Sequence, residues 1–325
     1  MSANNLPPFK TGLLPLDGIH TMYWEQSGNP DGQTVVLLHG GPGAGIDASS
    51  IQNFDTRHYR VITYDQRGAG RSTPAGCLEN NTTEHLIRDL ETLRQHLRVK
   101  SWTISGGSWG SALALAYAQN FPEQVSGLIL RGIFLCQTSE IDWYFDGIRH
   151  FFPDAWRSFI EHLPVEQRNH AASAYYQLLL DPDLRVHTPA ARQWCLYEAR
   201  CATLLPDHQL SSSMNDQQCR TIARIQAHYF QNNFFMHDVS LLKDIERIKR
   251  IPVEIIQGRY DMICPPFGAD YLKQLLPKAD LKIVSNAGHS ATEPGIRRAL
   301  LEASEKFKRF HHQDIIEEPG YETTN

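Results

Sequence analysis

The chain has 325 residues, of which 41% are hydrophobic and 21% charged, and its formal net charge is −5 at pH 7. A nucleic-acid surface needs an excess of basic residues, so this balance argues against a nucleic-acid partner. No stretch approaches the roughly 18 consecutive apolar residues that span a bilayer, and residues 1–10 lack the apolar core of a secretory signal. We therefore expect a globular cytoplasmic protein with no membrane partner; its oligomeric state stays open.

The six cysteines form no metal-binding or disulfide pattern. No two of them have the C-x-x-C spacing of zinc and redox motifs. A chain of this length can bury its own core and does not need a disulfide framework. We therefore expect reduced thiols and no bound metal.

Strand and helix patterns alternate along the first third of the chain. Aliphatic and β-branched runs typical of buried strands occupy residues 34–38, 60–64, 102–104 and 125–130. Apolar residues at helical spacing occupy residues 83–97 and 111–119. This alternation predicts a mostly parallel sheet wound with right-handed crossovers.

The pattern changes at about residue 133. Aromatic residues cluster there and helical periods continue to about residue 240, after which strand signals return at 253–256 and 281–284 and a last helix at 295–310. The predicted fold class is α/β: a mostly parallel sheet flanked by helices, with an inserted helical cap subdomain. Residues 1–134 and 241–325 would form the core, and residues 135–240 the cap.

Residues 106–110, Gly-Gly-Ser-Trp-Gly, fit the G-x-S-x-G pattern between a predicted strand and a predicted helix. That context is the one a nucleophile elbow requires, because the serine sits on a tight turn that raises its hydroxyl above the sheet. Ser108 is therefore the candidate nucleophile. The alternative is a glycine-rich turn that only joins strand to helix.

The first predicted strand runs directly into residues 39–43, His-Gly-Gly-Pro-Gly. An oxyanion hole needs two backbone N–H groups close to the reacting carbon, and glycine permits that approach. We predict Gly41 and Trp109 as the donors. The segment lacks the ending of a phosphate loop and the spacing of a dinucleotide fingerprint, although a plain structural turn remains the alternative.

A serine hydroxyl needs a base, and the base needs an orienting acid. In α/β-hydrolases the chain order is Ser, then Asp or Glu, then His. Asp261 follows the strand at 253–256 and His289 follows the strand at 281–284. We therefore predict His289 as general base and Asp261 as its orienting carboxylate, with Asp270 or Asp280 as the fallback.

Two further features lie near these residues in the sequence. Residues 65–72, Asp-Gln-Arg-Gly-Ala-Gly-Arg-Ser, follow the second predicted strand, and a salt-bridged loop that braces the site is favoured over direct substrate contact. Cys264, three residues after Asp261, either lines the substrate pocket or is a buried free thiol.

Together these segments resemble the proline iminopeptidase (prolyl aminopeptidase) family of α/β-hydrolases. The resemblance covers about residues 17–310 and is carried by residues 39–43, 65–72, 106–111, 131–135, 258–262 and 288–290 with Glu293 and Pro294. It implies a serine exopeptidase that releases N-terminal proline from small peptides, without metal or cofactor.

The resemblance also implies substrate-binding residues in the cap. A charged α-amino group, with a pKa of about 8, should meet acidic residues, and aromatic walls should hold the proline ring. Glu198 matches one glutamate that binds the amine in the family, and Phe134 and Tyr144 match positions around the ring. Where the family has a second glutamate this chain has Gln226, which can accept a hydrogen bond but brings no charge.

Two alternatives remain at this stage. The first is a related α/β-hydrolase acting on a different small amide or ester, since Gln226 removes one charge from the amine site. The second is an inactive hydrolase fold that serves as a binding scaffold. Such scaffolds usually lack a member of the triad, whereas Ser108, Asp261 and His289 are all in place.

Overall fold

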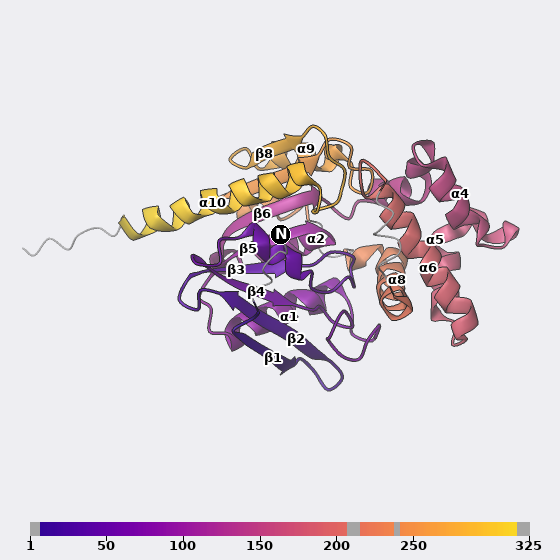
Figure 1. Ribbon diagram of the computed structural model, residues 1–325, viewed down its shortest axis with the longest axis horizontal. Coiled ribbons are helices and arrows are strands. Elements are labelled where there is room, and N and C mark those ends of the chain that lie inside the picture. The colour runs from indigo at the N-terminus through magenta and orange to yellow at the C-terminus, as the bar shows by residue number, and fades with distance from the viewer. Residues whose placement is uncertain (1–6, 207–214, 237–240, 317–325) are drawn as a thin grey trace, which may run out of the picture.

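The computed structural model describes residues 7–206, 215–236 and 241–316 (Figure 1). Its centre is an eight-stranded sheet in the order β1-β2-β4-β3-β5-β6-β7-β8. The strands are β1 Lys10–Pro15, β2 Thr21–Gly28, β3 Gln33–Leu38, β4 Tyr59–Tyr64, β5 Trp102–Ser108, β6 Val125–Ile133, β7 Val253–Gly258 and β8 Asp280–Val284. Every predicted strand is confirmed, and each extends one to four residues beyond the predicted run.

The strands from β4 to β8 pair in parallel, whereas β1 and β2 form an antiparallel hairpin at one edge of the sheet. The sequence patterns missed this hairpin. Most of β1 is exposed, and β2 buries the polar residues Glu25, Gln26 and Ser27 in addition to Met22 and Trp24. Glu25 of β2 forms an ion pair with Arg71, and Gln26 accepts hydrogen bonds from Arg60. The buried polar residues interrupt the hydrophobic pattern of this strand after two positions.

Both faces of the parallel strands are buried, because consecutive side chains of a strand point to opposite faces. One face contributes Val36, Ile62, Leu130 and Ile255 to one hydrophobic cluster. The other contributes Val35, Val61, Ile129 and Ile256 to a second cluster. The continuous aliphatic runs in the sequence are the consequence of this burial on both sides.

Helices cover the two faces unequally. The helices α1 Thr83–His96, α2 Trp109–Asn120 and α9 Pro266–Leu275 add buried residues to the first cluster. The long helix α10, Pro294–Ile316, supplies Ile296, Ala299, Leu300 and Phe307 to the second cluster and crosses the sheet (Figure 1). The helices predicted at 83–97, 111–119 and 295–310 are confirmed; α9 was not predicted.

The residues between β6 and β7 fold mainly as helices that gather at one end of the molecule (Figure 1). They include α3 Thr138–Asp142, α4 Pro153–Glu161, α5 Ala171–Leu180, α6 Leu184–Cys201 and α8 Asp216–Gln231. Helix α8 contacts the core, since Tyr229 on it donates a hydrogen bond to Asn81 at 3.0 Å. We propose the division predicted from the sequence, with residues 135–240 as a cap on a core of residues 1–134 and 241–325.

No helix in the described part of the chain is both long and apolar enough to cross a membrane. The six cysteines are all free thiols, and five of them are buried.

Candidate active site

Ser108 occupies a strained turn between β5 and α2. Its φ is +57° and its ψ is −128°, outside the regions that a serine ordinarily adopts. The backbone approaches closely around the turn: a Cβ on Gly106 would lie 2.3 Å from the carbonyl oxygen of Gly110. The elbow predicted from G-x-S-x-G therefore has the expected strand–turn–helix geometry.

Asp261 and His289, which lie 28 residues apart in the chain, are hydrogen-bonded to each other. The ring Nδ1 of His289 lies 2.8 Å from Oδ2 and 3.0 Å from Oδ1 of Asp261. Both side chains are buried: His289 is 8% exposed and Asp261 is 1% exposed. Because β7 and β8 are parallel neighbours, the loops after them meet at the same edge of the sheet. The predicted pair is thus brought together, whereas the fallback Asp280 forms an ion pair with Lys306.

The carboxylate of Asp261 is held by donors of its own loop and strand. Backbone N–H groups of Ile263 and Cys264 donate to Oδ1 at 3.1 and 2.8 Å. The side-chain amide of Gln257, fully buried in β7, donates to Oδ2 at 3.1 Å. These bonds fix the orientation of the carboxylate, which in turn orients the imidazole ring of His289.

The backbone of His289 is also held from two sides. Its N–H donates to the carbonyl of Ala202, just beyond the end of α6, at 2.8 Å. Its carbonyl accepts a hydrogen bond from Arg131 of β6. Burial lowers the pKa of that guanidinium. The histidine loop is therefore attached both to the sheet and to the cap.

Ser108 and His289 line the same cavity of about 330 Å³, on the cap side of the sheet edge. Within the described residues, no hydrogen bond joins the serine hydroxyl to the imidazole. Such contacts are often long in enzymes without substrate and shorten when substrate binds. The strained elbow and the Asp261–His289 pair therefore face one space without yet forming a continuous hydrogen-bonded row.

Gly41 and Trp109, the predicted oxyanion donors, flank Ser108. Both line a smaller cavity of about 30 Å³ together with the serine. Trp109 is the first residue of α2, so its N–H is one of the donors that a helix leaves unpaired. Gly41 has φ +109°, and a Cβ there would lie 2.8 Å from the amide nitrogen of Gly43, so this position requires glycine.

Gln66, from the loop at 65–72, joins the two segments that carry these donors. Its N–H donates to Nε2 of His39 at 2.9 Å, and its side-chain amide donates to the His39 carbonyl at 2.8 Å. Its side-chain carbonyl accepts from the indole of Trp109 at 2.9 Å. Burial lowers the pKa of His39, so its ring stays neutral and can accept the Gln66 N–H. The loop at 65–72 braces the site, as the sequence favoured.

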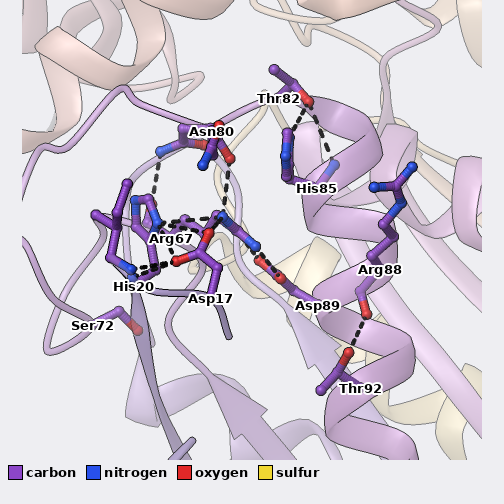
Figure 2. Close-up of polar contacts among 12 residues, drawn as sticks. Asp17, His20, Arg67, Ser72, Asn80, Thr82, His85, Arg88, Asp89 and Thr92 are labelled. Atoms are coloured by element: carbon purple, nitrogen blue, oxygen red, sulfur yellow. Dashed lines mark hydrogen bonds and ion pairs between the residues drawn. The ribbon is translucent and has the colours of Figure 1, made fainter. Parts of the chain in front are cut away.

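Arg67 extends that brace to the edge of the core (Figure 2). Its guanidinium forms a two-point ion pair with Asp89 of α1, at 2.5 and 2.7 Å, and a bond of 2.6 Å to Asp17. It also donates to the Asn80 carbonyl at 3.1 Å. The β1–β2 hairpin, the brace and α1 are thereby joined through one buried cation.

The smaller cavity is walled by aromatic side chains. Its apolar lining consists of Trp109, Phe134, Tyr144, Phe230, Phe234, Ile263 and Cys264. The rings of Phe134 and Phe234 meet edge to face at 4.7 Å, and those of Tyr144 and Phe230 lie 4.9 Å apart. Burial raises the pKa of the Cys264 thiol, which is therefore neutral at neutral pH. Phe134, Tyr144 and Cys264, which were predicted to bind substrate, all line this cavity together with Ser108.

Glu198 of α6 lines both cavities, and burial raises the pKa of its carboxyl group. Gln226 of α8 donates to Oε2 of Glu198 at 2.9 Å and to the carbonyl of Gly41 at 3.2 Å. The Gln226 carbonyl accepts from the indole of Trp194 at 2.5 Å. Because the indole N–H of Trp194 can only donate, its partner must be the carbonyl oxygen of Gln226. The NH₂ group of Gln226 therefore faces Glu198, and its carbonyl is already occupied.

Several residues of this site escaped the sequence patterns. Glu140 also lines the smaller cavity and accepts N–H bonds from Leu135 and Gln137, while burial raises the pKa of its carboxyl group to about 7. Gln66, Trp194 and Gln257 act through hydrogen bonds to other site residues. Glu140 follows residues 131–135 directly, which could have indicated it; a single glutamine has no comparable signature.

Among the described residues no group of three or more His, Cys, Asp or Glu side chains is arranged to hold a metal ion.

Comparisons with known proteins agree with this geometry. The profile of the α/β hydrolase fold family matches residues 33–295. The proline iminopeptidase of Arabidopsis thaliana is 47% identical over 307 residues, which are 93% of this chain and 81% of that protein. The proline iminopeptidase of Neisseria gonorrhoeae is 41% identical over 304 residues, 92% of this chain and 96% of that one.

Solved structures share the fold at lower identity. The crystal structure of a proline iminopeptidase from Mycobacterium smegmatis superposes with a TM-score of 0.62 at 19% identity, covering 94% of this chain and 99% of that one. An α/β fold family hydrolase from Bacillus anthracis gives a TM-score of 0.60 at 18% identity, covering 94% and 99%.

The chain is a member of the α/β-hydrolase fold class, as predicted. Within that class it belongs to the proline iminopeptidase family, which the sequence resemblance had indicated.

Proposed function

We propose that this protein is a serine-type prolyl aminopeptidase that releases N-terminal proline from small peptides. The carboxyl group of the partly buried Glu198, which shares both cavities with Ser108, carries the proposal. A peptide that begins with proline presents a charged secondary amine on a small apolar ring. Glu198 would pair with the amine while Phe134 and Tyr144 hold the ring, which sets the first carbonyl of the peptide beside the serine.

The proposed reaction proceeds through an acyl-enzyme. His289 takes the proton from Ser108 as the hydroxyl oxygen attacks the proline carbonyl carbon, and Asp261 stabilises the imidazolium that forms. The N–H groups of Gly41 and Trp109 stabilise the oxyanion. His289 then protonates the departing amine, which leaves as the shortened peptide. Water, deprotonated by the same imidazole, attacks the ester, and free proline leaves.

Cys264 adds a neutral wall to the proline pocket in this proposal. Its buried thiol lines the smaller cavity together with Phe134 and carries no charge that would compete with Glu198 for the amine. The six free thiols support a reducing compartment, and we propose the cytoplasm as the site of action.

Gln226 bears on which substrate the pocket takes. Its NH₂ group points at Glu198 and its carbonyl is occupied by Trp194, so Gln226 offers the amine neither a negative charge nor a free acceptor. Glu198 in its ionised form would make a neutral pair with the ammonium. This arrangement is also compatible with the alternative substrate class, a different small amide or ester.

A substrate panel distinguishes the two. Purified protein is assayed with p-nitroanilides of proline, alanine, leucine and cyclopentanecarboxylic acid, the last of which keeps the ring but lacks the amine. The aminopeptidase proposal requires the highest kcat/KM on the prolyl compound; equal or higher values on the cyclopentane compound would overturn it.

The Gln226→Glu variant sharpens the same test. A hydrogen bond to a charged group contributes about 1.5–3 kcal/mol, against roughly 0.5–1.5 for a neutral pair. We therefore expect kcat/KM on prolyl amides to rise, by about tenfold. No change, or a fall, would show that the pocket is adapted to another substrate.

A further inference from the structure

A second large cavity lies away from the candidate active site, between the core and the cap. It measures about 400 Å³, within the range of roughly 300–1,000 Å³ found for small-molecule sites. Its walls come from the core loop at 74–77, the end of α5, and the helices α6 and α8. The lining residues are Pro74, Ala75, Gly76, Cys77, Leu179, His187, Gln217, Arg220, Thr221 and Arg224.

The charged side chains that line this cavity are both positive. Among the residues that the structure describes, its lining includes two arginines and no acidic residue. Arg220 and Arg224 stand one turn apart on α8, so both guanidinium groups belong to the same face of the helix. Two cations this close repel each other unless an anion lies between them.

Neither arginine has a charged partner within the described ranges. Arg220 donates to the neutral side chains of Gln217 at 2.7 Å and Thr188 at 3.4 Å. Arg224 donates to the backbone carbonyl of Leu179 at 3.4 Å. Other cap arginines do form ion pairs: Arg192 with Asp216 and Arg185 with Asp183.

Arg224 also carries an unsatisfied donor. Its Nε is buried and has no hydrogen-bond partner. A buried donor without a partner is costly, and native proteins rarely keep one unless a ligand or water supplies the acceptor. A guanidinium with free N–H groups is suited to the paired oxygens of phosphate and carboxylate.

We propose that this cavity binds the oxyanion group, a phosphate or a carboxylate, of a small organic molecule through Arg220 and Arg224. The Thr221 hydroxyl lies one turn from Arg224 and supplies a further donor for the anion. Leu179 and Pro74 form an apolar wall for the rest of the ligand.

The proposed site is separate from the candidate active site. Ile225 of α8 packs against two core loops, those that contain Gly43 and Gly68. A Cβ added at Gly43 would lie 3.1 Å from Cβ of Ile225, and a Cβ added at Gly68 would lie 3.3 Å from its Cδ1. Arg224 lines the anion cavity, whereas Gln226 lines the active-site cavity. The inference therefore does not rest on the proposed aminopeptidase activity.

Calorimetric titration of the full-length protein tests the proposal directly. The protein is titrated with inorganic phosphate and, separately, with citrate, each against sodium chloride at matched ionic strength. We expect saturable binding of at least one oxyanion and none of chloride. Saturation by phosphate alone assigns the site to phosphate compounds, and saturation by citrate alone assigns it to carboxylates; absence of saturable binding in both arms overturns the proposal.

Two variants locate the binding. Arg224→Gln and Arg220→Gln should each weaken the oxyanion affinity at least tenfold, and the matched control Arg185→Gln, which removes a charge elsewhere on the cap, should leave it unchanged. Circular dichroism establishes that each variant is folded, and either arginine variant suffices if the other does not fold. Wild-type affinity in a folded arginine variant, or an equal loss in Arg185→Gln, overturns the assignment.

Discussion

The two sides of the candidate active site are held by different kinds of contact. On the sheet side, backbone groups do most of the positioning: Asp261 accepts N–H bonds from its own loop, and Ser108 is fixed by the turn itself. On the cap side, Glu198, Gln226 and Trp194 are positioned by bonds between side chains of two helices. Backbone geometry changes little when a single side chain is replaced, whereas a side-chain network changes with every substitution. The proposed chemistry is thus insensitive to the substitutions that alter the proposed specificity.

The largest effect is expected from Ser108→Ala, which removes the nucleophile on the sheet side. By comparison with the loss of a serine nucleophile in subtilisin, kcat should fall about a millionfold. The fall should be the same for prolyl p-nitroanilide and for a small ester, because both would use the same hydroxyl. Labelling by a serine-directed phosphonate should disappear as well; a variant that keeps more than a trace of either activity would place the nucleophile elsewhere.

Asp261→Asn should give the next largest effect. The amide oxygen can still accept the N–H bonds of Ile263 and Cys264, but the NH₂ group would face Nδ1 of His289 and favour the wrong tautomer. In a serine protease the same exchange lowers kcat about 10⁴-fold.

Steady-state kinetics on both substrates measures this loss. Asp280→Asn is the matched control, because Asp280 binds Lys306 at the edge of the sheet, and its kcat should equal that of the wild type. A normal kcat in Asp261→Asn would remove Asp261 from the proposed triad.

Glu140 lies where the two sides meet, just after β6, and affects stability. Burial raises its pKa from 4.5 to about 7, so the folded protein holds this proton more tightly than the unfolded chain does. The protonated Glu140 therefore makes its full contribution to the free energy of unfolding below pH 4.5, and this contribution is lost as the pH rises to 7. The loss is about 3 kcal/mol, from 1.36 kcal/mol per pKa unit.

Glu140→Gln removes this titration. The free energy of unfolding is measured by urea denaturation at pH 4.5 and at pH 8. On going from pH 4.5 to pH 8, the wild type should lose about 3 kcal/mol more than the variant does. Glu84→Gln, at an exposed carboxyl on α1, serves as the control. A difference between variant and wild type that stays constant with pH would mean that Glu140 ionises normally.

The smallest effect is expected from Glu198→Gln on the cap side. The amine would keep a neutral hydrogen bond and lose the charged one, so kcat/KM on prolyl p-nitroanilide should fall about tenfold. Turnover of the cyclopentane compound, which has no amine, should not change. Equal losses on both substrates would show that Glu198 supports the geometry of the site rather than binding an amine.

The residues on the sheet side of the site could be predicted from sequence patterns, whereas those on the cap side could not. Ser108, Asp261 and His289 each follow a strand of a recognisable type, and chain order then assigns their roles. Glu198 and Gln226 lie on helices with no such landmark, so only the family resemblance indicated them.

The hydrogen bonds of Gln226 could not be predicted from the sequence. Whether an amide donates or accepts depends on its neighbours, here Trp194 on another helix, and helix packing cannot be read from local periodicity. The β1–β2 hairpin was missed on similar grounds, because Glu25 and Gln26 are buried by polar partners that lie far along the chain.

The contact between the end of α6 and the histidine loop bears on how the cap can move. Ala202 holds the N–H groups of both His289 and Ser290, while Glu293 bonds the N–H groups of Leu204 and Gly288. A cap that swung open at this point would carry the imidazole away from its aspartate. Opening the cap at this point would break these hydrogen bonds or displace the histidine loop, so we expect the cap and the proposed catalytic histidine to move together.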